Sequence, residues 1–297
     1  DRLVGALCST VLNHRTDEYG GRFENRTRFA LQVVESIKEH APHICIDYKL
    51  PIITDNPLRG KGGLKIDEAV EFAKKLEEAG VNMIHVGQAN HTGNLNDTIP
   101  AMGTQPYCFM QSYTKRVKDA VSIPVSAVGR IVTPQNGEAL IENGVCDIVV
   151  KKIEDGQPCR IRLCMMCNKG CTDSIQNRKF LSCVLNAENG YEYERTITPA
   201  DDKKKVVIVG AGPAGLEAAR VAAVKGHDVI VYDKDTQVGG QLNIASVPPR
   251  KEEMNRAIHY LANEVKVLGV DLRLGKAVTS EDILADQPDE VIVATGA

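Results

Sequence analysis

Tryptophan is absent from this chain and other aromatic residues are few: the 297 residues include 0 Trp, 5 Phe and 8 Tyr. Recognition of single-stranded nucleic acid relies on stacking aromatic side chains, so the composition gives that function little material. An excess of positive charge is also lacking, because the formal net charge is −3. A negative net charge offers no general attraction to nucleic acid or to an anionic membrane. We therefore expect neither as a partner.

Long apolar runs are missing as well, since none approaches the ~18 residues that a membrane-spanning helix needs. The first residues, Asp1-Arg2-Leu3-Val4, do not resemble a secretory signal peptide. With 43% hydrophobic and 25% charged residues, the composition is that of an ordinary globular protein. We expect a cytoplasmic protein, and at roughly 100 to 200 residues per domain the length predicts two or three domains.

Cysteine is plentiful and unevenly placed: five of the nine cysteines lie in the segment 159–183. The spacing Cys164-x2-Cys167-x3-Cys171-x11-Cys183 lets thiolates converge on one soft metal centre, with Cys159 outside the pattern. Four thiolates satisfy zinc or an iron-sulfur cluster, and four buried structural thiols are the plainer alternative. A nucleotide motif shortly after Cys183 indicates electron transfer and favours iron-sulfur.

Before this segment, short apolar runs alternate with amphipathic stretches, which predicts α/β structure with a parallel sheet. The predicted strands are 44–50, 82–86, 123–128 and 146–150; the predicted helices are 25–40, 68–79 with a cap at Asp67, and 134–143 after a cap at Thr133. A complete (β/α)8 barrel takes about 250 residues, and only about 150 precede the cysteines. The four predicted strands could form an open sheet or half of such a barrel, and if they belong to a barrel its first half is missing. In that case we expect a fragment that is poorly soluble and inactive by itself.

A glycine motif, Gly210-Ala-Gly212-Pro-Ala-Gly215, follows a predicted strand 206–209 and opens a helix that runs to Lys225. Gly210 suits a tight turn, Gly212 lets the backbone approach a pyrophosphate, and Gly215 allows close helix packing. Asp233 ends the next predicted strand, 229–232, where a carboxylate can accept hydrogen bonds from a ribose diol. The motif fits FAD and NAD alike, and the acid disfavours a 2′-phosphate. A glycine turn without a ligand is the alternative.

The order of these motifs resembles the iron-sulfur flavoenzymes of the old yellow enzyme superfamily, such as 2,4-dienoyl-CoA reductase, 2-enoate reductase and trimethylamine dehydrogenase. The resemblance covers nearly the whole chain. It rests on the cysteine spacing, the glycine motif, and the segments Asn13–Gly21, Glu24–Arg26, Val128–Ile131 and Gly239–Leu242. It implies a C-terminal half of an FMN-type TIM barrel (1–158), a 4Fe-4S segment (159–200) and the start of a Rossmann-like FAD/NAD(P)-binding domain (201–297).

The resemblance also implies roles for single residues. Lys49 matches a position that contacts the FMN ring, Arg130 one that holds flavin phosphate, and His91 a histidine that assists protonation; Gln241 falls in the FAD site. The plainer alternatives are a lysine paired with a carboxylate, a surface arginine and a loop histidine. His85, within a predicted strand, is expected to be a packed core residue.

Two departures from the family pattern concern the ends of the barrel segment. The family's tyrosine proton donor would fall at Arg2, and a second phosphate-binding segment expected after Val150 is replaced by Lys151–Gly156. An arginine is a poor proton donor because it does not readily deprotonate.

The predicted function is NAD(P)H-dependent reduction of an activated C=C bond, of enoate or dienoyl-CoA type, with FAD, a 4Fe-4S cluster and FMN carrying the electrons. The alternatives are an oxidative amine demethylase of the same family and a non-catalytic nucleotide-binding electron carrier. We expect a small-molecule substrate and nucleotide cofactors as partners, and leave assembly into a homo-oligomer open.

Overall fold

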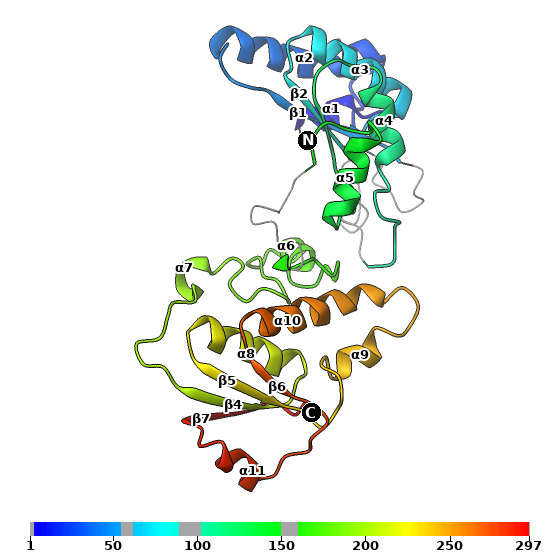
Figure 1. Ribbon diagram of the computed structural model, residues 1–297. Coiled ribbons are helices and arrows are strands. Elements are labelled where there is room, and N and C mark those ends of the chain that lie inside the picture. The colour runs from blue at the N-terminus through cyan, green and yellow to red at the C-terminus, as the bar shows by residue number, and fades with distance from the viewer. Residues whose placement is uncertain (1–2, 55–61, 89–101, 150–159, 297) are drawn as a thin grey trace. The chain divides into compact units, whose positions relative to one another are not determined.

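A computed structural model describes residues 3–54, 62–88, 102–149 and 160–296. The chain forms two compact units, Asp1–Lys152 and Ile153–Ala297, each with its own parallel sheet (Figure 1). Each unit is described by itself. The division of the second unit into a cysteine segment (159–200) and a nucleotide-binding domain (201–297) stays a prediction.

The first unit contains a parallel sheet of order β1-β2-β3, with helices between the strands. Its elements are α1 (Leu3–Cys8), α2 (Phe23–His40), β1 (Asp47–Ile52), α3 (Ile66–Glu78), β2 (Met83–Gln88), α4 (Gln111–Lys118), β3 (Val125–Ala127) and α5 (Pro134–Glu142). The register pairs Leu50 with Val86 and Ile84 with Val125. These apolar side chains share one face of the sheet, where they pack with Phe72 of α3.

Local sequence patterns predicted most of these elements, and the structure corrects three of the predictions. Helix α3 begins at Ile66 with Lys65 as N-cap, so the cap predicted at Asp67 is wrong; Asp67 instead lies in the first turn, where a carboxylate suits the helix dipole. Strand β1 begins at Asp47 rather than residue 44, because its partner strand begins at Met83, opposite Asp47. Ile44 is consequently exposed.

The third correction concerns the strand predicted at 146–150. Among its described residues only Ile148 joins the sheet, through a single parallel bridge to Ser126. The predicted helix after Thr133 is confirmed, because Thr133 and Asn136 form a capping box at its start.

A buried arginine of α2, Arg26, connects this helix to α1 and α3 in the first unit. Arg26 is 3% exposed and donates to the carbonyl oxygens of Cys8 and Gly21 and to Glu68 Oε1, the last at 2.6 Å. A buried guanidinium is costly unless its donors are satisfied. Arg26, one of the residues that carry the family resemblance, thus has a structural role that ties α1, α2 and α3 together.

The second unit begins with the cysteine segment and continues into a four-stranded parallel sheet of order β6-β5-β4-β7. Its elements are α6 (Thr172–Gln176), α7 (Glu192–Arg195), β4 (Lys205–Val209), α8 (Pro213–Val224), β5 (Asp228–Tyr232), α9 (Gln241–Ala245), the 3₁₀ helix η3 (Glu252–Met254), α10 (Asn255–Val267), β6 (Asp271–Arg273), α11 (Ser280–Ala285) and β7 (Glu290–Val293). Counted from β4, this order is 3-2-1-4, which begins the doubly wound order of dinucleotide-binding folds.

Both faces of this second sheet are covered, as the alternation along β4 and β5 requires. Val206 and Ile208 pack with residues of α8 and α10, whereas Val207 and Tyr232 face the side of α11. Figure 1 shows α8 and α10 on one side of the sheet and α11 on the other.

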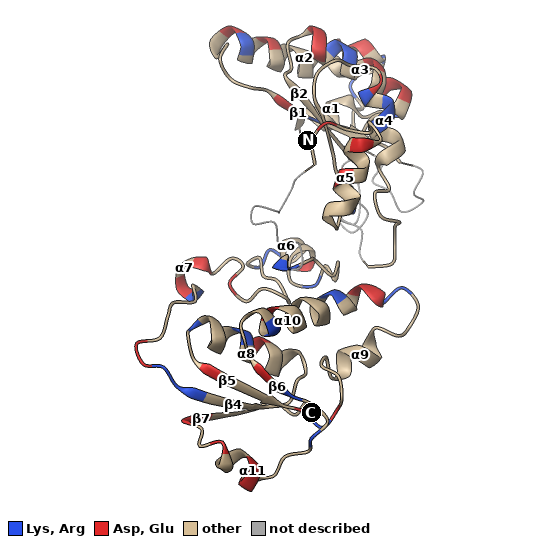
Figure 2. Ribbon diagram, in the orientation of Figure 1, with Lys and Arg blue, Asp and Glu red and all other residues tan. Residues whose placement is uncertain are grey.

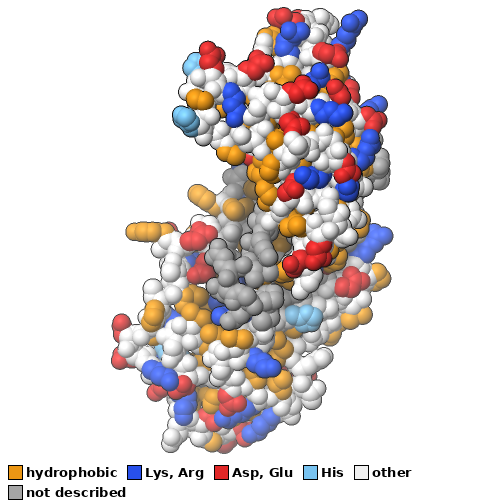
Figure 3. All heavy atoms as spheres, turned by 45° about the horizontal axis from the view of Figure 1, so that its top comes forward, with side chains coloured by type: hydrophobic (Ala, Val, Ile, Leu, Met, Phe, Trp, Pro, Cys, Tyr) orange, Lys and Arg blue, Asp and Glu red, His pale blue; other side chains and the backbone are white. Residues whose placement is uncertain are grey.

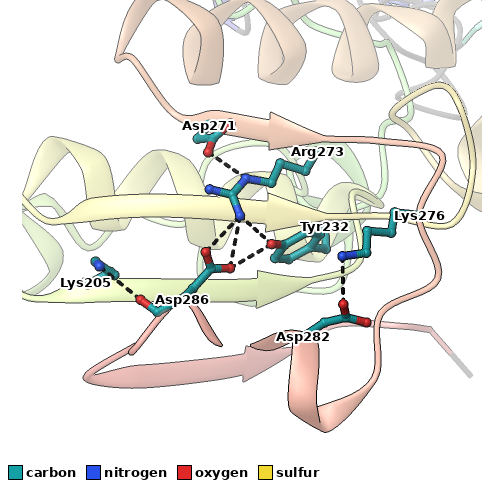
Figure 4. A network of polar contacts seen from close by, with 7 residues as sticks. All are labelled: Lys205, Tyr232, Asp271, Arg273, Lys276, Asp282 and Asp286. Atoms are coloured by element: carbon teal, nitrogen blue, oxygen red, sulfur yellow. Dashed lines mark hydrogen bonds and ion pairs between the residues drawn. The ribbon is translucent and has the colours of Figure 1, made fainter. Parts of the chain in front are cut away.

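Polar contacts fasten α11 to the sheet beside Tyr232 (Figure 4). The Tyr232 hydroxyl donates to Asp286 Oδ2 at 2.7 Å, and Arg273 Nη1 donates to Asp286 Oδ1 at 2.9 Å. Lys205 Nζ donates to the Asp286 carbonyl oxygen, and Lys276 Nζ pairs with Asp282 at 2.8 Å. Hydrogen bonds from Tyr232 and Arg273 lower the pKa of Asp286, so it stays a carboxylate.

Charges of both signs are mixed on the surface of each unit. Figure 2 shows acidic and basic residues along the same helices, for example α2 and α3, and Figure 3 shows the same mixture on one face. Within the described ranges, no helix has the length and apolar character needed to span a bilayer.

Candidate functional site

The glycine motif forms the turn from β4 into α8, and two of its glycines are required by close backbone contacts. Gly210 has φ +113°, and a Cβ there would lie 2.3 Å from the Ala294 carbonyl oxygen beside β7. A Cβ at Gly215 would lie 1.8 Å from the carbonyl oxygen of Gly210. Larger residues would therefore push α8 off the sheet, the packing role expected of these positions.

Gly212 differs from its neighbours because a Cβ there would meet no atom within 4 Å. It is the N-cap of α8, followed by Pro213 at the first helical position. The unpaired N–H groups and positive dipole of a helix start attract phosphate. Gly212 thus combines open space with the end of a 12-residue helix, as a bound pyrophosphate would need.

Asp233 follows β5, and its side-chain carboxylate accepts a hydrogen bond from the backbone of the glycine loop. Its Oδ2 accepts the Ala211 N–H at 2.6 Å and its Oδ1 accepts the Asp235 N–H at 2.8 Å. Two carboxylate oxygens provide about four lone-pair sites, so Asp233 retains acceptor capacity for a ribose diol. It sits where the motif predicts, with an additional structural role that the sequence did not show.

Gln241 is the first residue of α9 and lies near the same loop. The Gly239 N–H donates to the Ala211 carbonyl oxygen at 2.8 Å, and a Cβ at Gly240 would lie 3.1 Å from the Gly212 Cα atom. The structure therefore brings the start of α9 to the glycine motif, from a position nearly thirty residues later in the chain. Gln241 itself is exposed and directly follows Gly240, the residue that approaches Gly212.

The thiols of Cys164, Cys167, Cys171 and Cys183 are also brought together. Partial enclosure of the Cys164 sulfur raises its pKa, and the other three cysteines are close enough to raise it further by charge repulsion. The Met166 N–H donates to Cys164 Sγ at 3.3 Å and opposes this shift. In the part of the chain that the structure describes, however, no group of three or more His, Cys, Asp or Glu side chains is arranged to hold a metal ion. The metal centre stays a prediction.

Gly170, which sequence reasoning missed, joins the two halves of this thiol group. The Ser182 N–H donates to the Gly170 carbonyl oxygen at 2.9 Å, so the residues just before Cys171 and Cys183 lie side by side. A Cβ at Gly170 would lie 2.7 Å from the Ser182 carbonyl oxygen. The only available signal was a glycine directly before a cysteine, which does not reveal a partner twelve residues away.

The described part of the cysteine segment is held against α10 within the second unit. Three contacts do this: Arg160 Nε to Glu264 Oε1 at 3.0 Å, Arg162 Nη2 to Tyr260 Oη at 3.1 Å, and Arg256 Nη1 to the Cys164 carbonyl oxygen at 2.7 Å. The thiol group and the glycine loop therefore belong to one packed unit.

In the first unit, Lys49, His85 and Ser126 form a row across β1, β2 and β3. The strand alternation places this row on the face opposite the helices. Burial and the Lys49 charge lower the pKa of His85, while Asp47 opposes the shift. His85 is half-buried rather than packed in the core, which corrects the expectation, because the core residues of β2 are its neighbours Ile84 and Val86.

Two features of this row suit a polar ligand. Lys49 is exposed, and its Cε would lie 3.2 Å from a Cβ at residue 87, so Gly87 makes room for the lysine side chain. Ser126 is 8% exposed, and its Oγ has no hydrogen-bond partner among the described residues. A buried hydroxyl normally finds a partner. Ser126 could have been found from the sequence only if the register with His85 were known.

Arg130 lies three residues after the end of β3 and has left-handed backbone with φ +55°. It is buried, donates to the Gln105 carbonyl oxygen and stacks over Tyr107, with 5.0 Å from Cζ to the ring centroid. This burial contradicts the alternative that Arg130 is an ordinary surface arginine. His91 and Arg2, and the segment Lys151–Gly156, lie outside the described residues.

With this geometry in hand, comparison with known proteins is informative. Residues 3–151 match the NADH:flavin oxidoreductase / NADH oxidase family, and residues 204–297 match the pyridine nucleotide-disulphide oxidoreductases. The chain is 72% identical to a bilirubin reductase of Mediterraneibacter gnavus (strain CC55_001C) over 309 aligned residues, covering 100% of this chain and 48% of that protein.

This chain belongs to the NADH:flavin oxidoreductase / NADH oxidase family. The family is enzymatic, and its name supports a flavin and a pyridine nucleotide as cofactors. The chain spans about half the length of the curated relatives it matches.

Two solved structures of similar architecture confirm the old yellow enzyme type of fold. A 2-naphthoyl-CoA reductase complex matches with a TM-score of 0.88 and 28% identity, covering 99% of this chain and 46% of that one. A histamine dehydrogenase from Rhizobium sp. 4-9 matches with a TM-score of 0.85 and 28% identity, covering 99% and 44%. The first unit is accordingly of the TIM-barrel type expected from the sequence.

Proposed function

We propose that this chain is part of an NAD(P)H-dependent flavin and iron-sulfur reductase that acts on a conjugated C=C bond. The observation that carries the proposal is the packing of a four-thiol group and an open glycine loop into one unit. A hydride donor delivers two electrons together, whereas an iron-sulfur centre accepts them singly, so a nucleotide site beside thiolates suits electron transfer.

The relatives support a choice of substrate class to test. The chain is 72% identical to a bilirubin reductase, and bilirubin is a tetrapyrrole with conjugated C=C bonds. We therefore place a linear tetrapyrrole first among substrates to test, ahead of the enoate and dienoyl-CoA classes. The structural similarity to a 2-naphthoyl-CoA reductase supports reduction of unsaturated carbon as the general chemistry.

The second unit offers a site for FAD, although the same loop accommodates ADP or NAD. Gly210 and Gly215 shape the turn, Gly212 leaves open space at the start of α8, and Asp233 and Gln241 flank it. Cys164, Cys167, Cys171 and Cys183 are the candidate ligands of a 4Fe-4S cluster, because four cysteines at this spacing are the donor set that such a centre needs.

The first unit offers residues for FMN, which when bound supplies the hydride chemistry. Lys49 provides a cation that stabilises negative charge on a reduced ring, and Arg130 provides forked donors that suit a phosphate. Ser126 adds a buried hydroxyl to the same strand face as Lys49. We assign the proton transfer to His91, because histidine is the side chain that most often serves as a general acid or base in enzymes.

The cofactor proposal is tested by extraction from the anaerobically purified chain. About four iron and four sulfide per chain, with FAD and FMN released on denaturation, is the expected result. Zinc without sulfide would overturn the electron-transfer role. ADP in place of FAD would support the non-catalytic electron-carrier alternative.

The reaction is tested on the protein that contains this chain, with NADH, NADPH and bilirubin under anaerobic conditions. We expect NAD(P)H oxidation matched by loss of the bilirubin absorbance. Substituting His91→Gln should lower the rate of substrate reduction about 10²-fold or more while flavin reduction by the nucleotide continues. His43→Gln, at an exposed histidine, is the matched control and should behave as wild type.

Oxidative amine demethylation is the second candidate, favoured by 33% identity to an N,N-dimethylglycine/sarcosine dehydrogenase of Chromohalobacter salexigens, a protein named for N-methylated substrates. The two candidates differ in the direction of electron flow. Formaldehyde release from methylated amines, with no consumption of bilirubin or cinnamate, would replace the reductase proposal with this one.

A further inference from the structure

Helix α10 has two faces with different partners. Its apolar residues Leu261 and Val265 pack with α8 residues and the strand residues of the second sheet. Its polar residues Arg256, Tyr260 and Glu264 are four positions apart, and this spacing puts them on one side of a helix. Figure 1 shows the segment that contains α6 on the side of α10 away from the sheet.

Glu264 on this polar side is buried and Arg256 is half-buried, so both charges need partners. Glu264 is 5% exposed and receives Arg160 of the cysteine segment at 3.0 Å. Arg256 is anchored one turn back by the buried Glu253 at 3.1 Å and donates forward to the Cys164 carbonyl oxygen at 2.7 Å. Buried charges cost free energy unless they are paired and hydrogen-bonded. The polar face of α10 is thus built to receive the cysteine segment.

The contacts reach both ends of the thiol group. Arg256 touches the backbone of Cys164, the first of the four cysteines. At the other end, Tyr260 accepts from Arg162, which also donates to Asn186, and Asn186 bridges to Cys183, the last of the four. Arg162 further stacks over the Tyr260 ring, with 4.9 Å from Cζ to the centroid. One helix therefore contacts the backbone of Cys164 directly and is linked through Arg162 and Asn186 to the backbone of Cys183.

We infer that Arg256, Tyr260 and Glu264 form a docking stripe that positions the four-thiol group on the nucleotide-binding domain, with Arg256 as the residue that fixes Cys164. As far as it concerns a bound cluster, this inference rests on the proposed function. Reduction adds one negative charge to a thiolate-ligated centre. If the four thiolates hold such a centre, the Arg256 guanidinium at the Cys164 backbone would stabilise that charge and so raise the reduction potential.

The docking stripe is tested first without iron, by amide hydrogen exchange of the full chain. In Arg256→Met, amides of residues 160–171 should exchange about tenfold or more faster than in wild type, because a charge-assisted hydrogen bond is lost. Amides of β4 and β5 should keep their protection, which shows that the domain is folded. Unchanged exchange at 160–171 would overturn the inference.

Three further variants separate docking from general destabilisation. Tyr260→Phe removes only the hydroxyl that accepts from Arg162, and should speed exchange near residues 183–186 more than near Cys164. Arg256→Lys keeps a cationic donor and should restore part of the protection. His259→Ala changes an exposed residue of the same helix and should have no effect; an effect equal to that of Arg256→Met would count against a specific stripe.

The second readout is the reduction potential after anaerobic reconstitution with iron and sulfide, followed by electron paramagnetic resonance. Arg256→Met should shift the midpoint to a more negative potential, and Arg256→Lys should shift it less. An unchanged potential in Arg256→Met would overturn the electrostatic part of the inference. Failure of the wild-type chain to take up iron with sulfide would instead overturn the cluster in the proposed function, while the exchange result still decides the docking stripe.

Discussion

The two units use their parallel sheets in different ways. In the first unit, helices pack on one face of β1–β3, and the opposite face carries the row Lys49, His85 and Ser126. In the second unit, apolar side chains fill both faces, and the candidate functional residues lie at the ends of strands and in the loops that follow. In the first unit a ligand would therefore contact side chains on one face of the strands. In the second unit it would contact the backbone of the loops that follow the strands.

This difference determines which substitutions damage structure and which damage binding. The first unit relies on buried side chains such as Arg26, whose contacts are long-range. The second relies on glycines, whose importance lies in the side chain they lack. Five substitutions test the contrast.

Arg26→Met should have the largest effect, because it leaves Glu68 and the Cys8 carbonyl oxygen without their donor. We expect a loss of about 3 kcal/mol in the free energy of unfolding of the first unit. Hydrogen exchange of β1 and β2 measures it, with β4 and β5 as internal reference. Arg15→Met, which breaks an exposed pair with Asp17, is the matched control; equal losses in the two variants would contradict the structural role of Arg26.

Gly215→Ala and Gly212→Ala separate packing from binding in the second unit. The added methyl at 215 would lie 1.8 Å from the Gly210 carbonyl oxygen, so we expect a loss of stability of about 1–3 kcal/mol. The methyl at 212 meets nothing, so stability should stay near wild type while nucleotide affinity falls about tenfold or more. Denaturant unfolding and titration with FAD or NADH measure the two effects. Unchanged affinity in Gly212→Ala would contradict the phosphate site.

Tyr232→Phe tests the polar network that holds α11. Removing the hydroxyl that donates to Asp286 should cost about 1 kcal/mol of stability in the second unit. Tyr193→Phe, at a side chain that is fully exposed, should cost nothing measurable by the same denaturant unfolding. If both variants behave alike, the network shown in Figure 4 contributes no stability.

The smallest expected effect is a pH dependence in the first unit. Burial and Lys49 lower the pKa of His85 from its ordinary value of 6.5, so the folded state binds its proton less readily than the unfolded state. Stability should be constant above about pH 6.5 and decrease as the pH falls below it. His85→Gln should remove this component, as measured by unfolding at several pH values. A wild-type profile that is flat between pH 5 and 7 would contradict it.

Local patterns accounted for a large part of the fold. The capping box of Thr133 and Asn136 spans only four residues, so the sequence was sufficient to place the start of α5. The glycine loop was equally accessible, because its strand, turn and helix are contiguous. The start of β1 was misplaced because strand ends depend on the partner strand, which lies over thirty residues away.

The candidate site was foreseeable only where its residues are close in the chain. Cysteine spacing identified four thiols, and the glycine motif identified a phosphate-binding loop. Sequence reasoning missed Gly170 and Ser126. A glycine is needed at residue 170 because the backbone of Ser182 passes close to it, and Ser126 lies beside His85 only through the register of β2 and β3. It also missed helix α10, although Ile258, Leu261 and Val265 recur at helical spacing.

What the sequence by itself determined is the set of chemical groups: four thiols at fixed spacing, a glycine turn before a helix, and Asp233 after the next strand. What the tertiary structure decided is which of them meet. The docking stripe on α10, the burial of Arg26 and the row beside Lys49 all join residues distant in the chain. Such contacts depend on strand register and helix packing, which arise only when the whole core forms.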